Sequence, residues 1–115
     1  GGFLQGAGWL TMEEVKWKSN GQITTHSPST YKIPAINDMP EKFHVEIFKN
    51  GKNKENVVNK SKTTGEPPLM NAMSVFFAIK DAISSIGNYN VIPAIDAPAT
   101  PEKILMSIKN LKNKL

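Results

Sequence analysis

The segment of residues 69–86 is so uniformly apolar that it constrains the fold more than any other part of the chain. The two prolines before it suit the start of a helix and Gly87 suits its end, so the pattern predicts a helix of about five turns. Only a narrow polar stripe interrupts the apolar surface, so we expect most of the helix to be buried at the centre of the core. The stripe consists of Asn71, Ser74, Asp81 and Ser85.

Short alternating segments precede this helix and predict strands. Residues 12–18 and 22–26 flank the turn signal Ser19-Asn20-Gly21 and should form a hairpin. Residues 43–48 alternate most cleanly and should form the best strand. We expect this strand to pack against the long helix. The apolar partners would be Phe43, Val45 and Ile47 on the strand, and Phe76, Phe77, Ile79 and Ile83 on the helix.

Helical patterns also occur at the two ends of the chain. Residues 1–11 resemble the end of a helix, and a last helix should begin after Thr100, with Pro101 at its first position and lysines in its last turns. The whole pattern predicts an α+β fold: residues 1–115 as a single unit, in which helices pack against a small, mainly antiparallel sheet.

Composition argues against several classes of function. The net charge is +4 and all 14 basic residues are lysine, so no arginine can read guanine in bidentate fashion, and the lysine-rich middle of the chain is explained by a solvated surface. A nucleic-acid module remains the third hypothesis. The absence of cysteine excludes an iron–sulfur cluster or a thiolate zinc site in this chain, and His26 and His44 are too isolated to predict a metal site. We also find no apolar stretch that we expect to span a membrane.

The sequence Gly65-Glu66-Pro67-Pro68-Leu69-Met70 places a carboxylate at the mouth of the long helix. Glycine before Glu66 lets the backbone pass close to a bulky ligand, and two prolines stiffen the chain after it. Glu66 could therefore be a general base held in place. The alternative is that Glu66 only complements the helix dipole and the free N–H groups of the first turn.

Several blocks of sequence, in one order, resemble the molybdenum hydroxylases, the family of xanthine dehydrogenase and aldehyde oxidase. Because they span nearly the whole chain, the resemblance is more specific than any single motif, and it is to the C-terminal segment of the molybdenum-cofactor-binding subunit. The blocks are Phe3 to Thr11, Glu13-Glu14, Ser29 to Pro34, Gly65 to Met70, Ser74 to Ile83 and Asp96 to Ile104.

The resemblance implies a reaction and roles for three residues. In this family a glutamate deprotonates a molybdenum-bound hydroxyl, which attacks an electron-poor carbon of a purine, another N-heterocycle or an aldehyde. Glu66 matches that glutamate and is the predicted catalytic base. Gln5 matches a glutamine that lies beside the cofactor, and we assign Gln5 and Gly65 to cofactor binding. The predicted cofactor is molybdenum–molybdopterin, with no metal ligand in this chain.

The resemblance also implies a larger context. We expect the chain to be a fragment of a molybdopterin-binding domain, because it opens inside a family motif, and to be inactive alone. Its partners would be the rest of the molybdenum-binding subunit, an iron–sulfur and FAD subunit or domain, and a small-molecule substrate, in a cytoplasmic homo-oligomer without nucleic acid or membrane. Missing neighbours should leave an apolar patch open. The alternative is a stand-alone, non-catalytic folding or protein-interaction domain.

Overall fold

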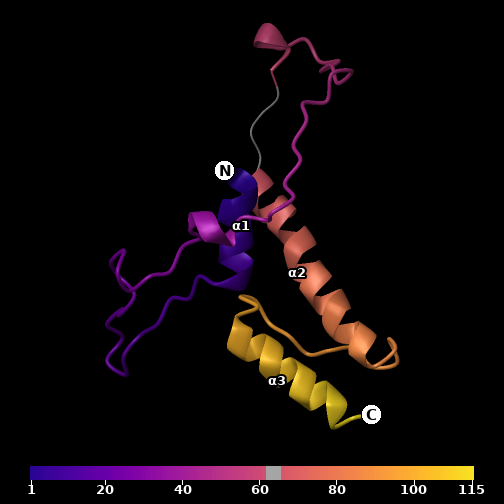
Figure 1. Ribbon diagram of the computed structural model, residues 1–115. Helices are drawn as coiled ribbons and strands as arrows, with labels where there is room; N and C mark the ends of the chain where they lie inside the picture. Colours follow the sequence, from indigo (N-terminus) through magenta and orange to yellow (C-terminus); the bar gives the residue numbers. More distant parts are fainter. Residues whose placement is uncertain (62–65) are drawn as a thin grey trace.

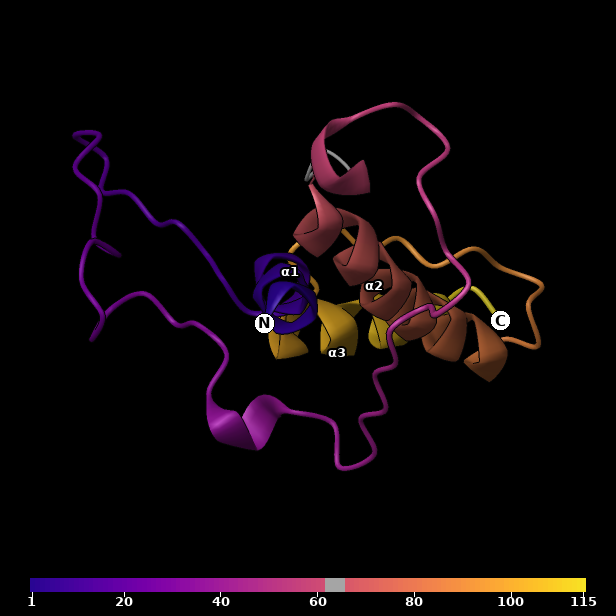
Figure 2. The same cartoon turned by 90° about the horizontal axis from the view of Figure 1, so that it is seen from above.

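The computed structural model describes residues 1–61 and 66–115, and three α-helices dominate it (Figure 1). Residues 12–61 extend well away from the helices as two long excursions, as Figure 2 also shows. Each excursion carries one short 3-10 turn. The helices are α1 (Gly2–Thr11), α2 (Pro67–Ile86) and α3 (Pro101–Lys112), and the 3-10 turns are Ile36–Asp38 and Val58–Lys60.

Helix α1 packs against the first half of α2 at a contact that only glycine permits. Gly6 is buried, and a Cβ atom at this position would overlap the backbone carbonyl of Pro68 and lie 2.9 Å from the Cβ of Ala72. The missing side chain therefore lets the two backbones touch. Gly2, one turn earlier, is less crowded, because its nearest neighbour would be Pro68 Cγ at 3.6 Å.

Helix α3 is tied to both other helices. The N–H of Ala99 donates to the carbonyl oxygen of Leu10 at 2.7 Å, which gives a partner to one of the carbonyls left open at the end of α1. At its other end, Leu111 is buried beside Gly87 at the C-terminus of α2. The predicted start of α3 is confirmed, since the Thr100 hydroxyl caps it by accepting from the N–H of Lys103 at 3.4 Å.

The predicted antiparallel sheet is wrong for the part of the chain that the structure describes. The hairpin prediction survives only as one isolated antiparallel bridge between Trp17 and Ile23, with the Lys18 N–H donating to the carbonyl of Gln22 at 2.9 Å. Residues 43–48 form no strand. Alternation specifies which faces could be buried, but a strand also needs a partner backbone to satisfy its N–H and C=O groups, and within residues 1–61 and 66–115 no other segment forms backbone hydrogen bonds with this one.

The predicted packing of residues 43–48 against the long helix is wrong for the same reason, although Ile83 of the predicted core is buried. Ile47 is 88% exposed, and Phe43 lies beside Phe3 of α1, with ring centroids 5.5 Å apart, instead of forming a strand against α2. Ala72 and Ile83 are the buried residues of α2, whereas Phe77 is 54% exposed. An open apolar surface was expected, and α2 provides one.

The length and composition of α2 correct one further expectation. This helix is long and apolar enough to cross a membrane, whereas no such stretch was expected from the sequence. Length and apolarity describe the core helix of a soluble protein equally well, so they do not distinguish the two settings. Helix α2 packs here on α1 and α3.

Candidate functional site

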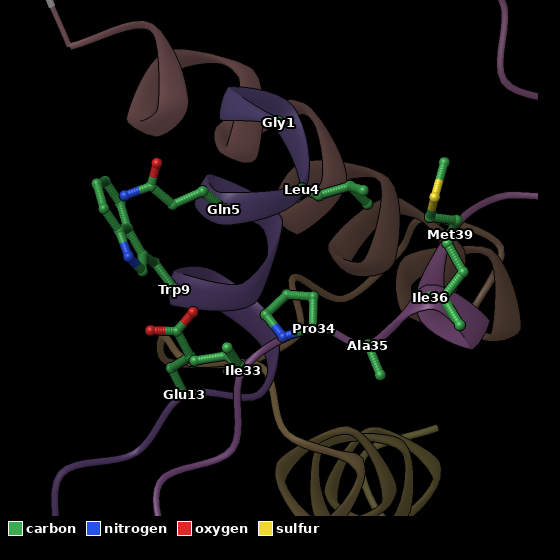
Figure 3. Close-up of a pocket in the computed structure, with 10 residues that line it drawn as sticks. All are labelled: Gly1, Leu4, Gln5, Trp9, Glu13, Ile33, Pro34, Ala35, Ile36 and Met39. Carbon is green, nitrogen blue, oxygen red and sulfur yellow. The ribbon is translucent and has the colours of Figure 1, made fainter. Parts of the chain in front are cut away.

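An open pocket of about 450 Å³ lies between α1 and the segment of residues 33–39. Figure 3 shows the residues that line it. We call it the Gln5 pocket. Its lining consists of Gly1, Leu4, Gln5, Trp9 and Glu13 from α1 and its flanks, and Ile33, Pro34, Ala35, Ile36 and Met39 from the facing segment.

Helical spacing places the polar and aromatic groups of this pocket together. Gln5 and Trp9 are four residues apart, so their side chains leave α1 on the same side, and Figure 3 shows the amide beside the indole. Leu4 points the other way, toward Ile36 and Met39. Gln5 is exposed and Trp9 is 36% exposed, so both can contact a ligand from solution.

A second glycine allows the facing segment to approach α1. A Cβ atom at Gly8 would lie 2.5 Å from Pro34 Cγ and 2.6 Å from a carboxylate oxygen of Glu13. Gly8 is buried beneath these two residues. The wall of the pocket therefore packs directly on the backbone of α1. This contact joins two residues, Gly8 and Pro34, that are 26 positions apart in the sequence.

One side-chain hydrogen bond joins the two walls at their base. The Tyr31 hydroxyl donates to Oε2 of Glu13 at 2.5 Å. This bond raises the pKa of Tyr31 above its ordinary value, with smaller contributions from burial and from the negative charge of Glu13. A hydrogen bond to an ionised acceptor is among the stronger kinds, so the pair is suited to hold a loop in place.

Glu66, the predicted base, lies at the first position before α2 and outside the lining of the Gln5 pocket. Its backbone carbonyl accepts from the N–H of Met70 at 3.3 Å, but its carboxylate makes no capping hydrogen bond. The side chain is exposed. The alternative role for Glu66 was to complement the helix dipole and the free N–H groups of the first turn. The carboxylate does not form the hydrogen bond to these N–H groups that this role includes.

The structure does bring the segments that contain Gln5 and Glu66 into contact. Gly6, which follows Gln5, touches Pro68, which is two residues beyond Glu66, although the two positions are far apart in the sequence. Gly65, the other predicted cofactor-binding residue, lies outside the described residues. Within residues 1–61 and 66–115, no three histidine, aspartate or glutamate side chains gather as a metal site.

Sequence reasoning missed Trp9, Glu13 and Tyr31 as parts of this site. All three fall within blocks that carry the family resemblance, but no role was assigned to them. Trp9 could have been found from its helical spacing with Gln5. The Glu13–Tyr31 bond could not, because 18 residues separate its partners and no local pattern indicates the pairing.

Comparison with known proteins identifies the family of this chain. Residues 1–40, which include α1 and all ten residues that line the Gln5 pocket, match the family model for the molybdopterin cofactor-binding domain. The similarity to xanthine dehydrogenases extends beyond residue 40 over nearly the whole chain, which confirms the resemblance predicted from the sequence. The chain belongs to the xanthine dehydrogenase family.

Three relatives show the extent of the match. Xanthine dehydrogenase of Oryza sativa subsp. japonica is 43% identical over an alignment 118 residues long. The alignment covers 93% of this chain and 8% of that protein. Xanthine dehydrogenase 2 of Arabidopsis thaliana is 43% identical over 93% of this chain and 9% of its own length. Xanthine dehydrogenase/oxidase of Rattus norvegicus is 46% identical over 90% of this chain and 8% of its own length. The chain thus spans less than a tenth of these relatives.

Proposed function

We propose that this chain contributes one part of the active site of a molybdenum-dependent hydroxylase resembling xanthine dehydrogenase. Gln5 binds the molybdopterin cofactor, and Glu66 is the general base. The substrate class is a purine, another N-heterocycle or an aldehyde. The proposal for Gly65 is cofactor contact through its backbone.

The observation that best supports this proposal is the contact between Gly6 and Pro68. It places the start of α2, with Glu66 before it, alongside the turn of α1 that carries Gln5. A cofactor-binding amide and a base must be near each other if both serve one reaction centre. The exposed carboxylate, which makes no capping hydrogen bond, is consistent with that role.

The Gln5 pocket fits the heterocyclic part of the cofactor and not its phosphate. The amide of Gln5 offers both donors and an acceptor to a pterin edge, and Trp9 and Ile33 offer apolar surface for a flat ring. The lining contains no lysine among the residues that the structure describes, and Glu13 brings a negative charge. The phosphate would therefore be held by groups outside this pocket.

The bound molybdenum cofactor would supply the redox and oxygen-transfer chemistry. Gln5 would orient the cofactor by hydrogen bonding, and Glu66 would accept a proton at its carboxylate. General bases work best when their pKa lies near the working pH, which requires partial removal of water from the carboxylate. Glu66 is exposed in this chain, so further protein would have to cover it.

The proposed partners follow from the same reasoning. They are the remainder of the molybdenum-binding subunit, an iron–sulfur and FAD subunit or domain, and a second copy of the enzyme, in the cytoplasm. The match to xanthine dehydrogenases runs through α2, which favours a core helix of a larger domain over a membrane span. A stand-alone folding or interaction domain remains the alternative function.

The decisive experiment is Glu66→Gln in the complete enzyme. This change keeps the size of the side chain but removes its ability to take a proton, so reduction by substrate should slow by roughly 10²–10⁴-fold while molybdenum content stays normal. The matched control is Glu102→Gln, because Glu102 is also an exposed carboxylate next to the proline that begins a helix, although it follows Pro101 whereas Glu66 precedes Pro67. Equally small effects of both changes would refute the assignment of Glu66.

The isolated chain provides a second test. Because the Gln5 pocket lacks a phosphate-binding group, the purified chain should contain no stoichiometric molybdenum and should show no turnover with substrate and an electron acceptor. Stoichiometric molybdenum in the chain would contradict the idea that most cofactor contacts lie elsewhere.

A further inference from the structure

In the described part of the chain, the hydrogen bond between Tyr31 and Glu13 links the segment of residues 27–39 to the end of α1. Within the described part of the chain, the other hydrogen bonds of residues 27–39 stay within that segment. The Tyr31 hydroxyl alone reaches the end of α1, where it meets Oε2 of Glu13. Residues 14–30 between the two partners loop outward and carry the Trp17–Ile23 bridge (Figure 1).

The same bond lies next to the Gln5 pocket. Glu13 lines the pocket, and Ile33 and Pro34, which follow Tyr31 closely, form the near part of its facing wall. Pro34 packs on Gly8 by van der Waals contact, and a contact of this kind limits how close the wall comes to α1 but does not by itself prevent sliding along it. A hydrogen bond is directional, so the Tyr31–Glu13 bond restricts this sliding.

We propose that Glu13 and Tyr31 are positioning residues that hold the wall formed by residues 33–39 against α1 and thereby set the shape of the Gln5 pocket. The consequence for catalysis rests on the proposed function, because it requires the pocket to face the cofactor. The consequence for the pocket itself does not. Neither residue touches a reacting group; both act through the position of Ile33 and Pro34.

The chain contains its own reporter for this proposal. Its two tryptophans are Trp9, which lines the pocket, and Trp17, which is 61% exposed in the outer loop. In a Trp17→Phe background, Trp9 fluorescence reports only on the pocket. Trp9 is 36% exposed, so complete loss of the wall can raise its accessibility to acrylamide by at most about threefold.

The test compares three variants in that background. Tyr31→Phe should increase acrylamide quenching of Trp9 and shift its emission to longer wavelength, because the wall is released. Glu13→Gln should preserve most of the wild-type quenching, because an amide oxygen still accepts from the Tyr31 hydroxyl. Tyr89→Phe is the control, since the Tyr89 hydroxyl contacts Asp81 at 3.4 Å, far from this pocket.

Circular dichroism of the same samples shows whether the helices persist. Unchanged Trp9 quenching in Tyr31→Phe would overturn the proposal. Loss of helix in that variant would overturn it too, because the bond would then support the whole fold and not one wall. Glu13→Ala removes the acceptor from the other side and should reproduce the effect of Tyr31→Phe.

A second arm separates this proposal from the proposed function. In the complete enzyme, Tyr31→Phe should lower molybdenum content or alter the pH profile of kcat, whereas the control Tyr89→Phe should leave both unchanged. If Trp9 responds in the isolated chain while the complete enzyme is unaffected, the positioning role stands and the cofactor role of the Gln5 pocket fails. If Trp9 does not respond, the positioning role fails whatever the enzyme does.

Discussion

The contact between α1 and α2 can be tested by adding a single carbon atom at Gly6. In Gly6→Ala the new methyl group would overlap the carbonyl of Pro68 and lie 2.9 Å from the Cβ of Ala72. Methyl groups in ordinary contact are about 3.5–4.0 Å apart, so the Ala72 contact alone requires α1 and α2 to separate by roughly 0.6–1.1 Å, and the closer overlap with the Pro68 carbonyl requires more. The obstacle is backbone, which cannot move aside by changing a rotamer.

The expected cost follows from two opposing effects. Forcing an extra carbon into a tight contact destabilises by about 1–3 kcal/mol, whereas replacing glycine by alanine within a helix stabilises by about 0.5–1 kcal/mol. The first effect is larger, so the net loss should be about 1–2 kcal/mol. For a domain of this size each kcal/mol lowers Tm by roughly 4–8 °C.

The assay is thermal unfolding followed by circular dichroism, with Gly2→Ala as the matched control in the same helix. The nearest atom to a Cβ at Gly2 is Pro68 Cγ at 3.6 Å, an ordinary contact, so this change should leave Tm unchanged or raise it. If Gly6→Ala were as stable as Gly2→Ala, the close approach of α1 to α2 would be absent in solution. The proximity of the segments that contain Gln5 and Glu66 would then lose its support.

Three further predictions concern single groups. The hydrogen bond to Glu13 raises the pKa of Tyr31. The stability that this bond contributes is therefore complete below the unfolded-state pKa of about 10, and it is lost as the pH rises through the higher folded-state pKa. Phenolate absorbance and Trp9 emission should change together over that pH range. Thr100→Ala removes the cap of α3 and should cost about 1 kcal/mol in thermal unfolding, whereas Thr100→Ser should cost less. Ser107→Ala should be neutral or stabilise the chain in the same assay, because the buried Ser107 hydroxyl has no hydrogen-bond partner among the described residues.

The helices were predictable because their signals are local. Thr100 followed by Pro101 marked the start of α3, and the two prolines and Gly87 marked the ends of α2, all within a few residues of the positions found. A helix satisfies its own backbone hydrogen bonds within one segment, so a short stretch of sequence contains most of the information that specifies it.

The sheet and the core were not predictable in this way. Residues 43–48 alternate as a buried strand would, yet Val45 is 72% exposed and Ile47 is 88% exposed. Alternation predicts that one face would be buried if a partner were present, and the partner is a separate segment that the pattern does not name. Helix α2 shows the same limit, since it is apolar on nearly every side while Phe77 stays 54% exposed.

The arrangement of the candidate site depends on glycines whose importance is visible only in three dimensions. Gly6 and Gly8 look like ordinary interruptions of a short helix, which should weaken it. In the structure Gly6 admits the backbone at Pro68 and Gly8 admits Pro34, so opposite sides of α1 receive α2 and the wall of the Gln5 pocket. The same glycines that weaken α1 therefore allow the segments around Gln5 and Glu66 to come together. Because this contact exists only in the folded chain, the sequence could indicate both residues but not their relation in space.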